Sequence, residues 1–122
     1  LEPGEVASVL SNTCREWVWC DLAVQSVGGV CNGIYPTDAA PQVEFLCSDS
    51  RSVYLCVEDD EQLDKYLEIS DRLPLVRRVI VFDIEMQIGR PMFAPVVLRS
   101  PPPLPSRLAQ EILPGPKSSL VQ

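Results

Sequence analysis

The stretch SVYLCVEDDEQLDKYLEISDRLPLVRRVIVFD (residues 52–83) decides the fold class. Residues 52–57 form a short apolar run that predicts a strand, and residues 78–82 form a second one. Between them lies a helical pattern that ends before Pro74. Two buried strands joined through a helix predict a parallel βαβ unit, because a parallel connection has to cross back along the sheet.

The helix of this unit has the clearest signals in the chain. Asp59 or Asp60 is expected to cap its start, within an acidic run at 58–61 that we interpret as a solvated helix start. The residues expected on its apolar face are Leu63, Tyr66 and Leu67. Two i,i+4 ion pairs are expected along it, namely Glu61 with Lys65 and Glu68 with Arg72.

The same order of elements is repeated upstream. Strands are predicted at 6–10 and 30–35, and helices at 13–28 and 40–48. The order βαβαβαβ predicts an α/β fold with a short parallel sheet. A sheet of four strands would keep two open edges and a small core, so we expect it to be part of a larger domain.

Local signals bound the two upstream helices. Thr13 and Glu16 have the spacing of a capping box, and Gly28 with Gly29 is the expected stop of the first helix. Apolar residues on two faces predict that this helix is covered on more than one side: Trp17, Cys20, Val24 and Val27 on one face, Val18 and Leu22 on the other. The second helix is expected to have Pro41 in its first turn and a buried stripe of Val43, Leu46 and Cys47.

Proline usage divides the chain after Asp83. Eight of the twelve prolines fall in residues 84–122, which are expected to be an irregular, disordered tail beside a folded region at 1–83. Within the tail, residues 99–107 contain Pro-x-x-Pro with an arginine at either end. Such a segment can dock on aromatic grooves, although composition alone also produces it.

Charge and cysteine usage exclude several classes of function. Residues 1–83 hold fifteen acids and six bases, so an acidic body argues against nucleic acid as a partner. The chain has no histidine, which excludes Ser-His-Asp and Cys-His catalysis. Its cysteines lack C-x-x-C spacing and are expected to be reduced thiols rather than metal ligands: Cys14, Cys20, Cys31, Cys47 and Cys56. With neither a signal peptide nor a transmembrane run, a cytoplasmic location is expected, and a chain that begins at Leu1 is interpreted as a fragment.

No candidate site survives from individual motifs. The glycines at 28–33 leave a helix and enter a strand, whereas a dinucleotide loop requires the opposite order. Asp83 ends a strand like a phosphoacceptor, yet Ser11 and Asn12 stand where further acids would be needed to hold Mg²⁺. No glycine-rich loop carries a lysine. We therefore assign no catalytic, cofactor-binding or metal-binding residue.

Residues 3–83 resemble the N-terminal part of the AMP-forming acyl-CoA synthetases, and most of all the long-chain fatty-acid–CoA ligase branch of that family. The resemblance rests on many short matches that occur in the same order and at the same spacing. The matching segments are VASVLSNTCREW (6–17), DLA (21–23), GGV (28–30), IYPT (34–37), QVEFL (42–46), DS (49–50), VEDDEQLDK (57–65), RLP (72–74) and VIVFD (79–83).

The resemblance implies an enzyme that uses ATP and Mg²⁺ to convert a fatty acid into an acyl-adenylate, and coenzyme A to convert the adenylate into a thioester. The phosphate loop, the adenylate motif, the hinge and the C-terminal lysine of the family are absent from these residues. The resemblance therefore implies a fragment that binds none of these cofactors and is inactive alone. Peripheral contact with a membrane stays open.

Two other interpretations stay open at this point. The first is a small interaction module whose proline-rich tail at 99–107 binds an aromatic-groove domain. The second is a free-standing flavodoxin-like ligand domain, which open sheet edges and the lack of a phosphate loop make less favourable.

Overall fold

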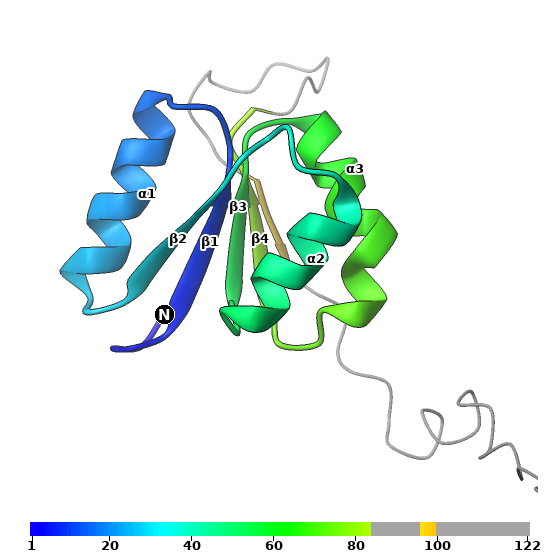
Figure 1. Cartoon of the computed structure of the whole chain (residues 1–122). Helices are drawn as coiled ribbons and strands as arrows, with labels where there is room; N and C mark the ends of the chain where they lie inside the picture. Colours follow the sequence, from blue (N-terminus) through cyan, green and yellow to red (C-terminus); the bar gives the residue numbers. More distant parts are fainter. Residues whose placement is uncertain (84–95, 100–122) are drawn as a thin grey trace, which may run out of the picture.

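A computed structural model describes residues 1–83 and 96–99 of the chain, and it is an α/β structure (Figure 1). Its elements follow in the order β1 (Val6–Leu10), α1 (Arg15–Ser26), β2 (Val30–Ile34), α2 (Ala40–Asp49), β3 (Tyr54–Val57), α3 (Asp60–Ile69), a 3₁₀ turn (Ser70–Arg72), β4 (Arg78–Val81) and β5 (Val96–Arg99). The predicted βαβαβαβ order is confirmed.

The strands form one sheet in the order β2-β1-β3-β4-β5. The first four strands are parallel, as predicted, and β5 runs antiparallel to β4, with Val96 opposite Val81 and Arg99 opposite Arg78. Residues 96–99 were expected to belong to an irregular tail, and for these four residues that prediction is wrong. The edge strands are therefore β2 and β5. The rest of the expected tail lies outside the described residues.

The two faces of the sheet carry different helices (Figure 1). The cluster between the sheet and the helices α2 and α3 is the main core, and its strand residues alternate along the chain, as Leu55 and Val57 do in β3. Cys56 points to the opposite face, where it meets Cys20 of α1. Burial on both faces explains why β3 is a continuous apolar run and β1 a mostly apolar one, rather than alternating strands.

Helix α1 does not begin as expected. Its N-cap is Cys14, which makes no side-chain capping hydrogen bond, so the predicted capping box of Thr13 and Glu16 is wrong. The Glu16 carboxylate instead accepts a hydrogen bond from Arg15 Nε at 2.7 Å. The stop is confirmed, because Gly28 has a φ of +78° and its N–H donates to Gln25 O at 2.9 Å.

The side of α1 that faces away from the sheet is exposed to solvent in the described part of the chain. Trp19 and Leu22 are 56% and 60% exposed, and Val18 is exposed as well. The cover predicted for this second face is therefore not supplied by residues 1–83 or 96–99.

Helix α2 agrees with its prediction, whereas α3 departs from its own in two respects. In α2, Pro41 lies in the first turn, Val43 and Cys47 are buried, and Leu46 packs against the core. In α3, Leu67 is 56% exposed, and the buried positions are Gln62, Tyr66 and Ile69. The helix is thus rotated so that the i, i+4, i+7 row from Gln62 faces the core.

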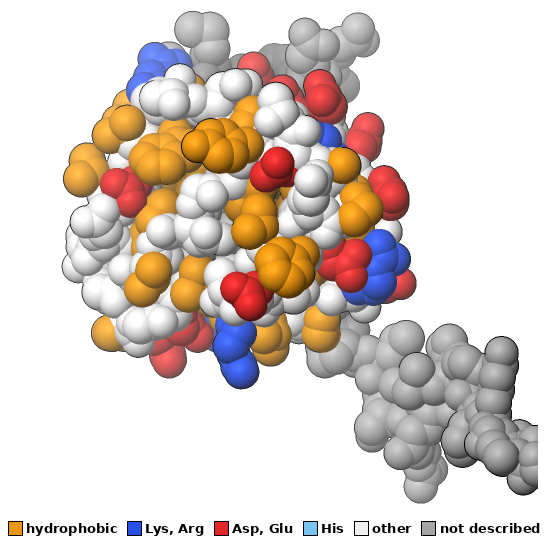
Figure 2. All heavy atoms as spheres, viewed as in Figure 1, with side chains coloured by type: hydrophobic (Ala, Val, Ile, Leu, Met, Phe, Trp, Pro, Cys, Tyr) orange, Lys and Arg blue, Asp and Glu red, His pale blue; other side chains and the backbone are white. Residues whose placement is uncertain are grey.

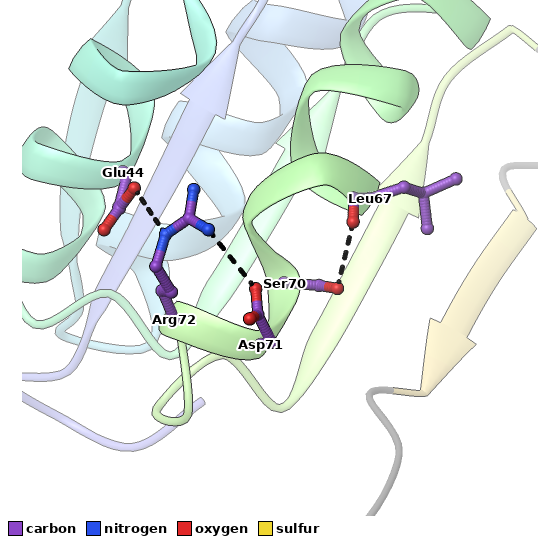
Figure 3. Close-up of polar contacts among 5 residues, drawn as sticks. All are labelled: Glu44, Leu67, Ser70, Asp71 and Arg72. Carbon is purple, nitrogen blue, oxygen red and sulfur yellow. Dashed lines mark hydrogen bonds and ion pairs between the residues drawn. The ribbon is translucent and has the colours of Figure 1, made fainter. Parts of the chain in front are cut away.

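The ion pairs expected along α3 are also wrong. Lys65 Nζ donates to Pro36 O at 2.6 Å and to Gln62 Oε1 at 2.9 Å. Arg72 pairs with Glu44 of α2 at 2.9 Å and with Asp71 at 3.7 Å (Figure 3). Each of the two cations therefore has one partner from a distant segment, Pro36 or Glu44, and one local partner other than the expected i,i+4 acid. Arg72 ties the end of α3 to α2.

The predicted cap at Asp59 is confirmed and can be tested. Its Oδ1 accepts a hydrogen bond from Gln62 N at 3.1 Å. We expect Asp59→Ala to lower the free energy of unfolding by about 1 kcal/mol, because an orphan amide at the helix start loses its acceptor. Urea unfolding of the chain measures the change, with the exposed neighbour variant Asp64→Ala as the control. Equal midpoints for the two variants would contradict the cap.

Candidate functional site: the carboxyl edge of the sheet

The carboxyl edge of the parallel strands is where ligands bind in open α/β sheets, at the point where the strand order reverses. In the order β2-β1-β3 the chain leaves β1 toward one side and β3 toward the other, which places this point between β1 and β3. Ser11 and Asn12 follow β1 there, and Glu58 follows β3.

A carboxylate occupies this switch point. Glu58 Oε2 accepts hydrogen bonds from Asn12 N at 2.8 Å and from Asn12 Nδ2 at 3.0 Å. A bound phosphate would need backbone amides of this kind as donors, and here the amide is already paired with a negative group. Asp83, one strand further, is exposed and donates its N–H to Glu58 O at 2.8 Å. The edge is therefore acidic and unsuited to a nucleotide phosphate.

An open hollow of about 450 Å³ lies beside the switch point, at the carboxyl ends of β1 and β2. It is lined by Ser11, Asn12, Thr13, Trp17, Gly33, Ile34, Tyr35 and Pro36. Gly33 lies against the Trp17 ring, and a Cβ at residue 33 would make an ordinary van der Waals contact of 3.5 Å with Trp17 Cζ2. These lining residues, all within the described part of the chain, include no charged side chain, so the hollow offers apolar and neutral polar contacts only.

Lys65 lies near this edge but is not available to a ligand. Its ammonium is part-buried between Pro36 O and Gln62 Oε1, which are both neutral acceptors. Because these contacts join α3 to the segment after β2, the lysine has a structural role.

A chain of polar side chains crosses the sheet under α2. Ser8 Oγ and Ser52 Oγ share a hydrogen bond of 2.6 Å, Asn32 Nδ2 donates to Ser8 Oγ at 2.9 Å, and Ser50 Oγ lies 2.8 Å from Ser52 Oγ. Among residues 1–83, every buried side-chain polar atom has a partner. The network is therefore structural, and it leaves no unpaired group for a substrate.

Cysteines lie on both faces of the sheet, and all five are free. Burial raises the pKa of Cys47 to about 11, and burial together with Asp21 raises the pKa of Cys31 to about 11. In the described residues no cluster of three or more His, Cys, Asp or Glu side chains is placed to bind a metal ion.

The motifs from the sequence take up defined places. Gly28 and Gly29 leave α1 and precede β2, the arrangement that argued against a dinucleotide loop. Glu58 was assigned to a solvated helix start, and this is wrong because it binds Asn12 across the switch point. No local sequence pattern could have predicted this contact, because the two residues are 46 positions apart. They come together because β1 pairs with β3. The Pro-x-x-Pro segment lies outside the described residues.

The described helices do not include one with the length and hydropathy needed to cross a bilayer.

Comparison with known proteins gives a consistent family. The chain is 34% identical over 80 residues to "Long-chain-fatty-acid--CoA ligase FadD15" of Mycobacterium bovis, a match that covers 66% of this chain and 13% of that protein. It is 29% identical over 91 residues to "Long-chain-fatty-acid--CoA ligase ACSBG2" of Xenopus laevis, covering 75% and 12%. The chain thus spans about an eighth of the length of the curated relatives it matches.

The fold agrees with this result. The crystal structure of the anthranilate CoA ligase AuaEII in complex with anthranoyl-AMP superposes with a TM-score of 0.63 at 26% identity, covering 66% of this chain and 16% of that one. The model of the family described as "AMP-binding enzyme" matches residues 1–109, which extends past Asp83 and includes β5. The resemblance to AMP-forming long-chain ligases is confirmed, and the chain belongs to the AMP-binding enzyme family.

Proposed function

We propose that this chain is an N-terminal section of the large adenylating domain of an AMP-forming long-chain fatty-acid–CoA ligase, and that it is inactive alone. The observation that carries the proposal is the family match over residues 1–109, together with relatives of which the chain covers only 12–13%. The names of those relatives favour a long-chain fatty acid as the substrate of the whole protein.

The whole protein would act in two steps. The carboxylate of the fatty acid attacks the α-phosphate of ATP, with Mg²⁺ as the counterion, and pyrophosphate leaves to give an acyl-adenylate. The thiol of coenzyme A then displaces AMP and forms the thioester. The developing phosphoryl charge requires cations and amide donors around it.

The carboxyl edge described above does not meet that requirement. The Glu58 carboxylate uses the amide of Asn12, Lys65 is bound by neutral acceptors, and the hollow near Trp17 has no charged lining. The section would therefore contribute part of the parallel sheet and not the phosphate site. The acidic composition of residues 1–83 also argues against nucleic acid as a partner. We also propose a cytoplasmic location for the whole protein.

Exposed apolar side chains support a larger domain. Figure 2 shows hydrophobic side chains spread over the face in view, with acidic side chains at its right-hand rim. Large exposed apolar side chains occur on several elements: Val18, Trp19 and Leu22 on α1, Val27 after it, Val30 on β2, Tyr35 after β2, and Phe45 on α2. Apolar surface of this extent is unusual on a small free-standing domain and is typical of surface that other protein covers.

ATP–pyrophosphate exchange tests the proposal. With a long-chain fatty acid, ATP and Mg²⁺, we expect the 122-residue chain to give no exchange above a heat-denatured sample, because the described carboxyl edge offers no cation or unpaired amide to a transferring phosphoryl group. A full-length long-chain ligase in the same assay is the positive control. Fatty-acid-dependent exchange by the chain would overturn the inactivity. A complete protein containing this section that fails to exchange with any long-chain fatty acid would overturn the ligase assignment.

A further inference from the structure

Two thiols from different elements meet on the α1 face of the sheet. Cys20 Sγ of α1 donates a hydrogen bond to Cys56 Sγ of β3 at 3.7 Å, and the two residues are 36 positions apart in the sequence. Cys56 is 3% exposed in a central strand, whereas Cys20 is half-buried. Cys20 is thus the more accessible residue of the pair, and the Cys56 sulfur lies next to its own.

We propose that Cys20 and Cys56 form a reversible disulfide when the protein meets a low-molecular-weight disulfide such as oxidised glutathione. The bond would fasten α1 to β3, and its formation would make this face of the sheet sensitive to the thiol redox state. The inference rests on the two side chains alone and does not depend on the ligase assignment.

The exchange has a balanced route. The thiolate of Cys20 attacks one sulfur of oxidised glutathione, forms a mixed disulfide and releases one glutathione thiolate. Cys56 then loses its proton to solvent or to that thiolate, attacks the sulfur of Cys20 and expels the second glutathione. Two protein thiols are oxidised and one glutathione disulfide is reduced to two thiols. The second step is intramolecular, so proximity favours it over attack by another thiol.

The hydrogen bond between the sulfurs assigns the order of attack. Once Cys20 is deprotonated, Cys56 can donate to it, which lowers the pKa of Cys20, while partial burial and Glu16 act in the opposite direction. The same pairing, with burial, raises the pKa of Cys56. Cys20 is therefore the attacking thiol and Cys56 the resolving one.

The geometry lets the bond close with a small movement. The sulfurs have to approach from 3.7 Å to about 2.05 Å, the length of a disulfide. Cys56 is fixed in the central strand β3, whereas Val24 is the one residue of α1 that is buried. A helix held by so few buried side chains can shift toward the sheet without disturbing the core under α2 and α3.

The other cysteines are poorer partners. Cys31 of β2 is a poorer attacking thiol than Cys20, because burial and Asp21 raise its pKa to about 11, and the thiol that contacts Cys20 is that of Cys56. Cys47 lies in α2, within the core cluster on the opposite face of the sheet. Cys14 lies before the start of α1, where its Sγ is 3.5 Å from Ser11 Oγ. The pair Cys20–Cys56 is therefore the one that we expect to close.

Oxidation of the full 122-residue chain tests the proposal. The reduced chain is incubated with oxidised glutathione at neutral pH, its remaining thiols are alkylated in denaturant, and its peptides are mapped by mass spectrometry. We expect one intramolecular link, between Cys20 and Cys56, and alkylation of three of the five cysteines. Treatment with dithiothreitol should restore five free thiols. The melting temperature of the oxidised chain should rise by roughly 10 °C.

Single variants separate the two roles. In the Cys56→Ser variant the reaction should stop at a stable glutathione adduct on Cys20. The Cys20→Ser variant should form no disulfide at Cys56, either with glutathione or within the chain. Cys31→Ser is the matched control and should form the link as the parent chain does. Oxidation in concentrated urea should give a mixture of disulfide pairs, which is the reference for a chain without folded structure. The proposal would be overturned if the native chain linked a different pair of cysteines or formed glutathione adducts without the Cys20–Cys56 disulfide. It would also be overturned if the native chain gave the same mixture of pairs as the chain in urea.

Discussion

Leu55→Ala is expected to lower the free energy of unfolding by about 2–5 kcal/mol, the largest effect of a single substitution that we predict. Leu55 is 0% exposed in the central strand β3, and it belongs to the core cluster between the sheet and the helices α2 and α3. Removing the methine carbon and the two methyl carbons there loses their transfer free energy and leaves a cavity between packed layers.

Leu67→Ala is the matched control for this substitution. The sequence pattern placed Leu67 on the buried face of α3, whereas it is 56% exposed, and its side chain extends away from Glu44 and Arg72 (Figure 3). We expect a change within about 0.5 kcal/mol. Urea unfolding of both variants and of the parent chain under reducing conditions measures the difference. Similar losses for the two leucines would show that α3 buries the face the sequence predicted.

The second large effect is a loss of stability at alkaline pH. Burial raises the pKa of Cys47 from its ordinary value of 9.0 to about 11. Between these two values the unfolded chain has released the proton and the folded chain keeps it, so the free energy of unfolding falls as the pH rises. The contribution of Cys47 is fully present below pH 9 and lost by about pH 11, and it amounts to about 2–3 kcal/mol.

Urea midpoints from about pH 8 to about pH 11, with a phosphine reductant present, measure this loss. Burial also raises the pKa of the Cys31 thiol, and the hydrogen bond with Cys20, together with burial, raises the pKa of the Cys56 thiol, so the test for Cys47 is the difference between variants. Cys47→Ala should be less stable than the parent chain near pH 8 and should show a shallower decline. Val43→Ala, which removes buried carbons of the same helix but no titratable group, should decline with pH as the parent chain does. Parallel curves for Cys47→Ala and the parent would refute the assignment.

The parallel strands were predictable because their environment is simple. β1 and β3 are buried on both faces, so nearly every side chain has to be apolar or paired, and a continuous run such as residues 52–57 results. The helix stop at Gly28 was predictable for a similar reason, because a positive φ of +78° favours glycine whatever surrounds it.

Strand β5 had no comparable signal. Residues 96–99 are a four-residue run flanked by proline-rich sequence, and strand formation there depends on pairing with Arg78–Val81 of β4. Pairing between distant segments is set by packing and by the available edge, which composition does not encode.

Polar partners were the least predictable feature of the candidate site. Arg72 has an acid at i−4, Glu68, yet it pairs with Glu44, because α2 lies alongside α3 and brings that carboxylate within 2.9 Å. Glu58 belongs to an acidic run that resembles a solvated helix start, yet the pairing of β1 with β3 brings it to Asn12. An exposed ion pair is worth little by itself, so small differences in position decide which partner is chosen.

The amino-acid order alone therefore determined the succession of strands and helices, the parallel sense of the first four strands and the resemblance to adenylating ligases. These features depend on burial periodicity, on stop residues and on short motifs, all of which are written within a few neighbouring positions. The packed molecule decided the rest: which leucine of α3 is buried, that β5 pairs with β4, that a carboxylate lies at the strand switch point, and that the sulfurs of Cys20 and Cys56 face each other. Each of these is a contact between segments far apart in the chain, and such contacts exist only once the layers have packed in one register.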